Sequence, residues 1–256
     1  MRLYFGQPAP VDFQTLVFQF PQADFQNLTR STIPLLCYWR NTEEVLPHLL
    51  KVVFGKKGAP SGDLCFEYPV KSAGRNMPSF TDVMYVTEYL ALGIEGKSTE
   101  PMYETVEQWL QAGQKPENRR RVLQHWLSLI RRRTGMVMEE EILGCVYQMV
   151  HRTASVCSLS RKECAVAYQV FHVEERTIEY QEYLARLSQA ITAGGKVGIW
   201  LHEIEAKTTD FFHQTQQTLN QAKSISDKAG IVRSAIMSGR LFSFTESGLQ
   251  RIRNSS

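Results

Sequence analysis

The spacing of hydrophobic positions predicts a helix over residues 41–54. Apolar residues recur there every three or four positions, two acids stand in the first turn, and Gly55 follows as a terminator. Thr42 is a plausible N-cap. Pro47 favours a start at Glu44 or later, because a proline costs little in the first turn of a helix.

Four later segments have the pattern of strands. Residues 64–70 alternate between apolar and polar and carry aromatic side chains. Residues 83–97 hold enough β-branched and aromatic residues for two short strands folded back as a hairpin, although no Asn-Gly turn marks the bend. Residues 164–173 form a continuous apolar run, which is typical of a strand covered on both faces. The pattern of residues 197–204 predicts a further strand.

The rest of the chain is largely helical in pattern. Helices are expected over residues 102–110, 117–133, 139–157 and 176–190, and Gly194 and Gly195 break the chain after the last of these. Residues 1–38 are rich in phenylalanine but show no sustained period, so no element is placed there. The order predicts one α/β domain, residues 1–207, followed by a polar helical C-terminal extension, residues 208–256.

Composition and charge narrow the functional classes. The 256 residues contain 29 Lys and Arg against 26 Asp and Glu, and a net charge of +3 is too small to indicate nucleic acid binding by itself. No apolar run approaches the ~20 residues that a membrane-spanning helix needs, and no signal-peptide pattern opens the chain. Five cysteines without a Cys-x-x-Cys pair disfavour a zinc site. We therefore expect a cytoplasmic protein with reduced thiols and no membrane partner.

One group of charged residues belongs to the predicted hairpin. If the chain bends about residues 88 and 89, Asp82 falls opposite Glu95, while Lys97 shares a strand face with Glu95. Directly opposed residues have Cβ atoms roughly 4.5–5.5 Å apart, so the two carboxylates could chelate one cation beside the amine. The alternative is a strand-edge salt bridge, worth about 0–1 kcal/mol if exposed.

Such a group suits hydrolysis of a phosphodiester. Mg²⁺ takes carboxylate and carbonyl oxygens, neutralises phosphate and activates water. Gly96 would let its carbonyl approach the metal, and Lys97 would orient or deprotonate the water, helped by a pKa lowered in a partly buried, metal-bearing cleft. No nucleophile elbow, P-loop or dinucleotide fingerprint is present. A second Glu-x-Lys, residues 205–207, has no hairpin acid before it, so we expect a solvated strand end there.

The same residues resemble a known superfamily. Asp82 followed after thirteen residues by Glu95-Gly96-Lys97, with a helix and a strand before and after, looks like the PD-(D/E)XK nucleases. The resemblance implies a restriction-endonuclease-like core with a four-stranded mixed sheet, Mg²⁺ or Mn²⁺, and DNA cleavage in bacterial defence or DNA processing. It implies that Asp82 and Glu95 are metal ligands and that Lys97 positions the water. The Pro-Asp pair of the superfamily's name is missing, since Thr81 precedes Asp82.

A second likeness covers roughly residues 75–175. The runs EGKSTEPMYETVEQWL and YQMVHRTAS resemble a family of small bacterial proteins of unknown function. In several branches of the nuclease superfamily, a Gln on the helix after the Glu-x-Lys strand and an acid on the first helix join the site. Gln148 is the candidate for the former, and Glu43 or Glu44 for the latter.

Other cations are candidates for nucleic acid contact. Arg152 lies one turn beyond Gln148 and suits a phosphate, and His151 is equally suited to a phosphate or to packing between helix and sheet. Two arginine triplets could follow a phosphate backbone or could form a solvated helix face. They are Arg119, Arg120, Arg121, Arg131, Arg132 and Arg133.

Two functions remain as hypotheses. The first is a metal-dependent nuclease that acts on DNA. The second is a catalytically inactive relative that serves as a binding or regulatory subunit. In either case residues 208–256 are a candidate contact for a protein partner or a second copy of the chain.

Overall fold

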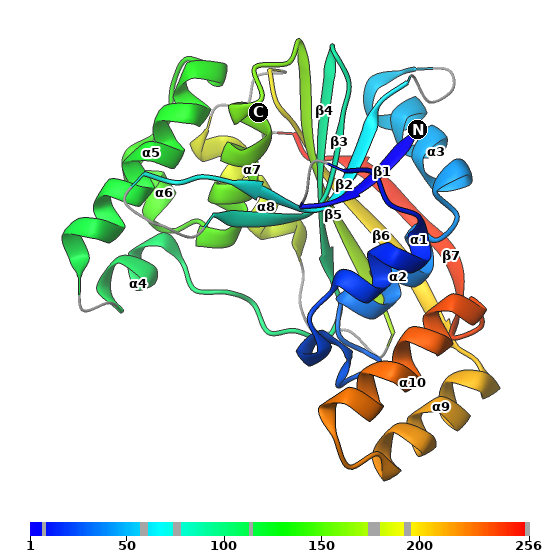
Figure 1. Ribbon diagram of the computed structural model, residues 1–256. Coiled ribbons are helices and arrows are strands. Elements are labelled where there is room, and N and C mark those ends of the chain that lie inside the picture. The colour runs from blue at the N-terminus through cyan, green and yellow to red at the C-terminus, as the bar shows by residue number, and fades with distance from the viewer. Residues whose placement is uncertain are drawn as a thin grey trace.

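A seven-stranded mixed β-sheet organises the chain (Figure 1). The computed structural model describes residues 1–6, 9–56, 61–73, 78–112, 115–173, 180–191 and 196–253. The predicted glycine break at residues 194 and 195 and the predicted helix start at residue 176 lie outside these ranges. The sheet confirms the α/β class that the alternating elements predict.

The strands lie in the sheet in the same order as in the chain. The second to fourth form an antiparallel meander, the fifth and sixth run parallel to the fourth, the first is parallel to the second, and the seventh is antiparallel to the sixth. Their bounds are β1 (Arg2–Phe5), β2 (Asp63–Val70), β3 (Ser79–Val86), β4 (Leu90–Lys97), β5 (Glu163–His172), β6 (Gly198–Thr208) and β7 (Phe242–Arg251).

The hairpin of β3 and β4 has the predicted bend. Val83 pairs with Ile94 and Val86 with Ala91, so the register is symmetric about residues 88 and 89. The hydroxyl of Thr87 accepts hydrogen bonds from two amides of the turn, at 3.1 and 2.9 Å, which supplies the turn chemistry that an Asn-Gly pair would otherwise give.

Two helical layers cover the sheet (Figure 1). One face carries α1 (Phe13–Gln19), the 3₁₀ turn η1 (Gln22–Phe25), α2 (Thr32–Trp39), α3 (Thr42–Phe54), α9 (Asp210–Gln221) and α10 (Ile225–Ser238). The other carries α4 (Val106–Gln111), α5 (Pro116–Thr134), α6 (Glu139–Leu143), α7 (Tyr147–Ser158) and α8 (Tyr180–Ala190). None of the helices in the described ranges is long and apolar enough to cross a membrane.

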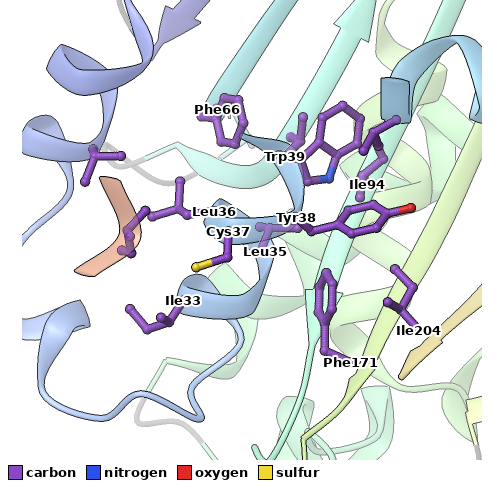
Figure 2. Packing of buried hydrophobic residues seen from close by; sticks show 14 of the residues in the cluster. Ile33, Leu35, Leu36, Cys37, Tyr38, Trp39, Phe66, Ile94, Phe171 and Ile204 are labelled. Atoms are coloured by element: carbon purple, nitrogen blue, oxygen red, sulfur yellow. The ribbon is translucent and has the colours of Figure 1, made fainter. Parts of the chain in front are cut away.

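Helix α2 lies in the middle of the first layer. Every residue from Ile33 to Trp39 is buried, and the side chains meet the sheet at Phe66, Phe171 and Ile204 (Figure 2). Helix α10 contacts α2 as well. Because α2 is covered on more than one side, it is apolar all round and lacks the amphipathic period that would have revealed it in the sequence.

Helix α3 begins earlier than expected. It starts at Thr42, with Asn41 as the N-cap, and Pro47 lies inside it rather than in its first turn. Gly55 ends the helix in the left-handed region, at φ 67°, as a C-terminal glycine should. The expected start at Glu44 or later is therefore wrong.

The prediction of a single helix over residues 139–157 is also wrong. This segment is divided into α6 and α7, because the three residues between the two helices leave the helical conformation and contact the segment before α4. Val106 N–H donates to the Cys145 carbonyl at 2.8 Å, and Tyr147 N–H donates to the Glu104 carbonyl at 3.0 Å. These bonds set the direction of α7, which faces β4.

The C-terminal segment is only partly the helical extension that the sequence predicts. Helices α9 and α10 are present, but the chain then returns as β7, which pairs with β6 along nine positions from Phe242 to Arg251. The expectation of a wholly helical appendage is corrected by this strand, which extends the central sheet. The polar residues on β7 hid it, since most of them are exposed at the sheet edge.

Candidate active site

Strands β3 and β4 bring the three hairpin residues together. The register that joins Val83 to Ile94 places Asp82 opposite Glu95, and the amide of Gly96 donates to Asp82 Oδ2 at 2.8 Å. Lys97 Nζ lies 3.0 Å from Glu95 Oε1. All eight residues of β4 are buried. Glu95 and Lys97 therefore form the salt bridge that the sequence left open as the alternative, but it is buried rather than exposed.

Helix α7 supplies two more side chains to Glu95. Gln148 Nε2 donates to Glu95 Oε1 at 2.7 Å, and Arg152 Nε donates to Glu95 Oε2. Arg152 Nη2 also lies 3.8 Å from Asp82 Oδ1. The two residues are four apart on one helix face, so α7 presents both to the sheet. The structure thus places Gln148 and Arg152 beside the hairpin residues, as the sequence predicted.

The two hairpin carboxyls titrate in opposite directions. Burial, and then the charge of Glu95, raise the pKa of Asp82 well above its ordinary range, against Arg152 and Lys97, which lower it. Burial also acts to raise the pKa of Glu95, but the charges of Arg152 and Lys97 outweigh it and the pKa is lowered. Glu95 is therefore the ionised member of the pair.

Lys97 differs from its predicted state. Burial acts to lower its pKa, but the neighbouring charges of Glu95 and Asp82 outweigh burial and raise it. This direction is opposite to the lowering that the sequence analysis expected for a metal-bearing cleft, because the sequence shows the burial but not how close the carboxylates lie. A raised pKa favours the protonated amine, which can donate a hydrogen bond or balance charge.

Glu67 on β2 is an acid of this site that the sequence analysis missed. It lies opposite Asp82, between the paired positions of β2 and β3, and has a positive φ of 50°. A non-glycine residue in this conformation costs on the order of 1–3 kcal/mol and tends to mark functional sites. Burial, and then the charge of Glu95, raise the pKa of Glu67 to about 7, although Arg152 opposes the shift.

A buried hydroxyl stands next to this cluster. Tyr168 on β5 pairs in register with Glu95, and its hydroxyl has no hydrogen-bond partner among the described residues. Burial, and then the charge of Glu95, raise its pKa well above the usual value. A buried hydroxyl without a partner costs about 1–3 kcal/mol, so a small polar species beside Glu95 would be favoured.

The cluster opens into a cavity of about 220 Å³ where the two helical layers meet. Its walls include Asp24 of η1, Leu35 of α2, and Glu100 and Tyr103 from the segment after β4. A Cβ atom on Gly96 would lie 3.3 Å from the Leu35 side chain, so this glycine lets α2 approach the sheet closely. Glu100 joins the layers, since its carboxylate accepts from the amides of Ser31 and Ser98 at 2.6 and 3.0 Å.

The cluster has the donor chemistry for a divalent cation, but its side chains are arranged as ion pairs and not around a metal. Three carboxylates, from Glu67, Asp82 and Glu95, face one small cavity, and the pKa values of the first two are raised because like charges and burial disfavour ionisation. Mg²⁺ would offset both effects and prefers such oxygens. Arg152 and Lys97 compete for Glu95, and over the described ranges no group of three or more His, Cys, Asp and Glu side chains has metal-binding geometry.

The acids expected from the first helix lie elsewhere. Glu44 of α3 lines a different cavity, with Tyr38, His48 and Glu246, and Glu43 lies exposed in the same helical turn. Neither lines the cavity that holds Glu95. Asp24 and Glu67 are the acids that line it instead.

His151 lies beside the cluster without lining its cavity. Its Nδ1 lies 3.1 Å from Ser79 Oγ and 3.4 Å from Arg152 Nη1, and its ring packs near Tyr147 and Trp126. These contacts hold the β3 start and the Arg152 side chain together. They favour the packing alternative for His151.

The first arginine triplet makes local contacts. Arg119 donates to the Trp109 carbonyl and lies over the Trp109 ring at 5.0 Å, and Arg120 pairs with Glu117 at 2.7 Å. Arg121 is exposed on the same helix. Arg119 therefore joins α5 to α4, whereas Arg120 makes an exposed pair within α5.

The second triplet is similar. Arg131 pairs with Glu139 at 2.5 Å, Arg132 is exposed, and Arg133 donates to three backbone carbonyls of the loops before β5 and β6. Neither triplet lines the cavity of Glu95. Their predicted contact with nucleic acid remains a prediction.

Comparison with known proteins places the chain in a family. Residues 10–215 match the family model described as a domain of unknown function, DUF6946. No curated protein and no solved structure matches the chain. The matched segment contains β2 to β6 and all the side chains that converge on Glu95. The chain belongs to the DUF6946 family.

Proposed function

We propose that this protein is a metal-dependent nuclease that hydrolyses phosphodiester bonds in DNA. The observation that carries the proposal is the convergence of Asp82, Glu95 and Lys97 with Gln148 and Arg152 of α7. The helix-strand-strand-strand-helix-strand order of α3, β2, β3, β4, α7 and β5 supports a restriction-endonuclease-like core.

In this proposal the acidic residues bind the metal and the basic residues contact the substrate. Asp82, Glu95 and Glu67 would hold Mg²⁺ or Mn²⁺, which supplies an activated water and neutralises the phosphate when bound. The amide of Gly96 holds Asp82, and Gln148 holds Glu95, so both carboxyls are oriented in advance.

The two cations act on the substrate. Protonated Lys97 donates a hydrogen bond that orients the attacking water or a phosphate oxygen. Arg152 offers a planar guanidinium with five donors, which suits the charge that develops on the phosphate. Since Arg152 and Glu95 are already paired, substrate and metal would separate them on binding.

Cleavage assays test this proposal. The purified chain is incubated with supercoiled plasmid, linear duplex and single-stranded DNA, with Mg²⁺, Mn²⁺ or EDTA. We expect metal-dependent cleavage that falls about 100-fold or more in Asp82→Asn and in Lys97→Met, because each removes a group that acts in the transition state. Circular dichroism checks that both variants fold.

The chain contains its own control. Glu205 and Lys207 form a second Glu-x-Lys at the end of β6, where Lys207 is exposed. Glu205→Gln and Lys207→Met should cleave at the wild-type rate. Metal-independent cleavage, or equal losses in the two pairs of variants, would contradict the proposal.

A second candidate function rests on the ion pairs of Glu95. Lys97 and Arg152 already balance its charge, and the raised pKa of Asp82 favours the neutral acid. Such a cluster is stable without metal, as expected of a catalytically inactive binding or regulatory subunit. This function predicts no cleavage with any divalent ion and a partner complex that survives Lys97→Met.

A further inference from the structure

A second cavity lies at the opposite end of the parallel strands. Its volume is about 550 Å³, more than twice that of the cavity beside Glu95. Glu163 at the start of β5, Gly198 at the start of β6 and Arg251 at the end of β7 line it, whereas Lys97 ends β4. This is the size range of pockets for small organic ligands.

The described lining of this cavity is strongly cationic. Arg133, Lys162, Lys196 and Arg251 face it against one acid, Glu163. That acid is already paired, since Lys56 Nζ lies 3.0 Å from Glu163 Oε1. The cavity therefore carries excess positive charge, which attracts an anion of more than one charge.

Arg133 organises the cationic wall. Its three guanidinium nitrogens donate to the carbonyls of Lys196, Arg161 and Lys162, at 3.0, 2.6 and 2.5 Å. These carbonyls belong to the two loops that carry Lys162 and Lys196, so one side chain fixes both loops. Carbonyl dipoles satisfy its hydrogen bonds but leave its net charge in place. A preorganised wall loses less entropy on binding.

The other wall is apolar. Val53 and Phe54 at the end of α3, with Ala165 and Trp200 of the sheet, line the same cavity. A ligand that satisfies both walls has a multiply charged anionic group joined to a flat apolar group. We propose that this cavity binds a nucleoside polyphosphate, held by side chains and not by a P-loop.

The proposal is tested by calorimetry on the full chain. ATP is titrated in EDTA, with tripolyphosphate and a short 5′-phosphorylated single-stranded oligonucleotide as separate probes. We expect ATP to bind more tightly than tripolyphosphate, because only ATP contacts the apolar wall, and more tightly than the oligonucleotide. Lys162→Glu combined with Lys196→Glu should weaken ATP about tenfold or more.

The control changes the same charge elsewhere. Lys207→Glu combined with Lys223→Glu alters two exposed lysines outside this cavity and should leave the affinity for ATP unchanged. The proposal is overturned if ATP does not bind, if tripolyphosphate binds equally well, if the oligonucleotide alone binds, or if the control loses the same affinity. All four lysines are exposed, so both variants should fold.

Discussion

Two carboxylates lie at the centres of polar clusters on opposite faces of the sheet, and the clusters differ in what surrounds them. Glu95 faces α7, and Glu246 of β7 faces α2. Both have a lowered pKa: for Glu95 two charges overcome burial, and for Glu246 the close approach of His202 comes first and the value is about 2. A lowered pKa by itself therefore does not distinguish a functional site from a structural network.

The cluster around Glu246 is a chain of complementary donors and acceptors. Trp39 Nε1 donates to Gln169 Oε1 at 2.7 Å, so the Gln169 amide nitrogen is the donor to His202 Nδ1 at 3.1 Å. His202 Nε2 lies 3.6 Å from Glu246 Oε2 and, like the Tyr168 hydroxyl, is buried without a hydrogen-bond partner among the described residues. Tyr38 donates to the other oxygen of Glu246 at 2.5 Å. Such a chain fixes α2, β5, β6 and β7 against one another.

The cluster around Glu95 instead contains acids whose ionised forms are disfavoured. Asp82 and Glu67 have raised pKa values, whereas the network of Glu246 contains no second acid of this kind among the residues named above. Glu67 also has an unfavourable backbone conformation. A purely structural cluster gains nothing from these features, whereas a site that binds a cation does. The two clusters therefore differ in the groups that surround the carboxylate and not in the direction of its pKa.

The largest expected effect is that of Glu95→Gln on stability. The substitution leaves Lys97 and Arg152 buried without their shared counter-charge, so the free energy of unfolding should fall by about 3–5 kcal/mol. Urea denaturation at neutral pH measures the loss. Glu117→Gln, which breaks only the exposed pair with Arg120, should cost less than about 1 kcal/mol. Equal losses of stability in the two variants would show that the ion pairs of Glu95 contribute little to the free energy of unfolding.

The next largest expected effect is a rise in Tm with Mg²⁺, which should depend on one cluster and not on the other. At a hundredfold excess over its dissociation constant, a ligand that binds only the folded state stabilises it by about 2.7 kcal/mol. We expect Mg²⁺ to raise the Tm of the wild type and of Glu246→Gln, and to have no effect on Asp82→Asn. A Tm shift that persists in Asp82→Asn would place the cation elsewhere.

Much of this arrangement could be predicted because the hairpin is local. Asp82 and Glu95 are thirteen positions apart, and the apolar residues between them set the strand register. The spacing alone therefore predicts that the two residues lie opposite each other. Gln148 came from the resemblance to the nuclease superfamily, and Arg152 from its place one helical turn beyond Gln148. Residues joined only by the tertiary fold were missed: Glu67 lies on the strand before the hairpin, helices α4 to α7 separate Tyr168 from it, and no period in the sequence relates them.

The same limit applies to the fold. The elements with one exposed face, such as α3 and α5, were predicted within a few residues of their observed bounds. Helix α2 is buried all round and β7 is largely exposed, so neither has a clear two-sided pattern. The raised pKa of Lys97 in the ion-paired cluster was not foreseen for a related reason, since it depends on distances that the sequence does not contain.

A smaller effect concerns Glu67 and pH. Its pKa is raised in the folded protein from the ordinary 4.5 to about 7, so between these values the folded state binds more protons and stability falls as pH rises. Glu67→Gln removes that cost. It should stabilise the protein by about 1–2 kcal/mol at pH 8, after allowance for solvent screening, and by nothing below pH 4.5. Denaturation curves across this range measure the difference, and a loss of stability at pH 8 would contradict it.

The smallest effect belongs to Glu246, and its pH dependence has the opposite sign. The pKa is lowered in the folded protein from the ordinary 4.5 to about 2, so the unfolded state binds more protons between these values and stability falls as pH drops. Glu246→Gln should cost about 1 kcal/mol at neutral pH, because the half-exposed carboxylate loses a charge-assisted bond from Tyr38 and its contact with His48 Nε2 at 3.0 Å.

That cost should shrink as the pH falls from 4.5 toward 2, where the wild-type carboxyl is itself neutral. Glu67→Gln and Glu246→Gln therefore change stability in opposite directions at pH 8, although both replace a glutamate by its amide. If the two variants shift the denaturation midpoint in the same direction, the distinction between a cation site on the α7 face and a structural network on the α2 face fails, because both carboxylates would then be simple ion-pair partners.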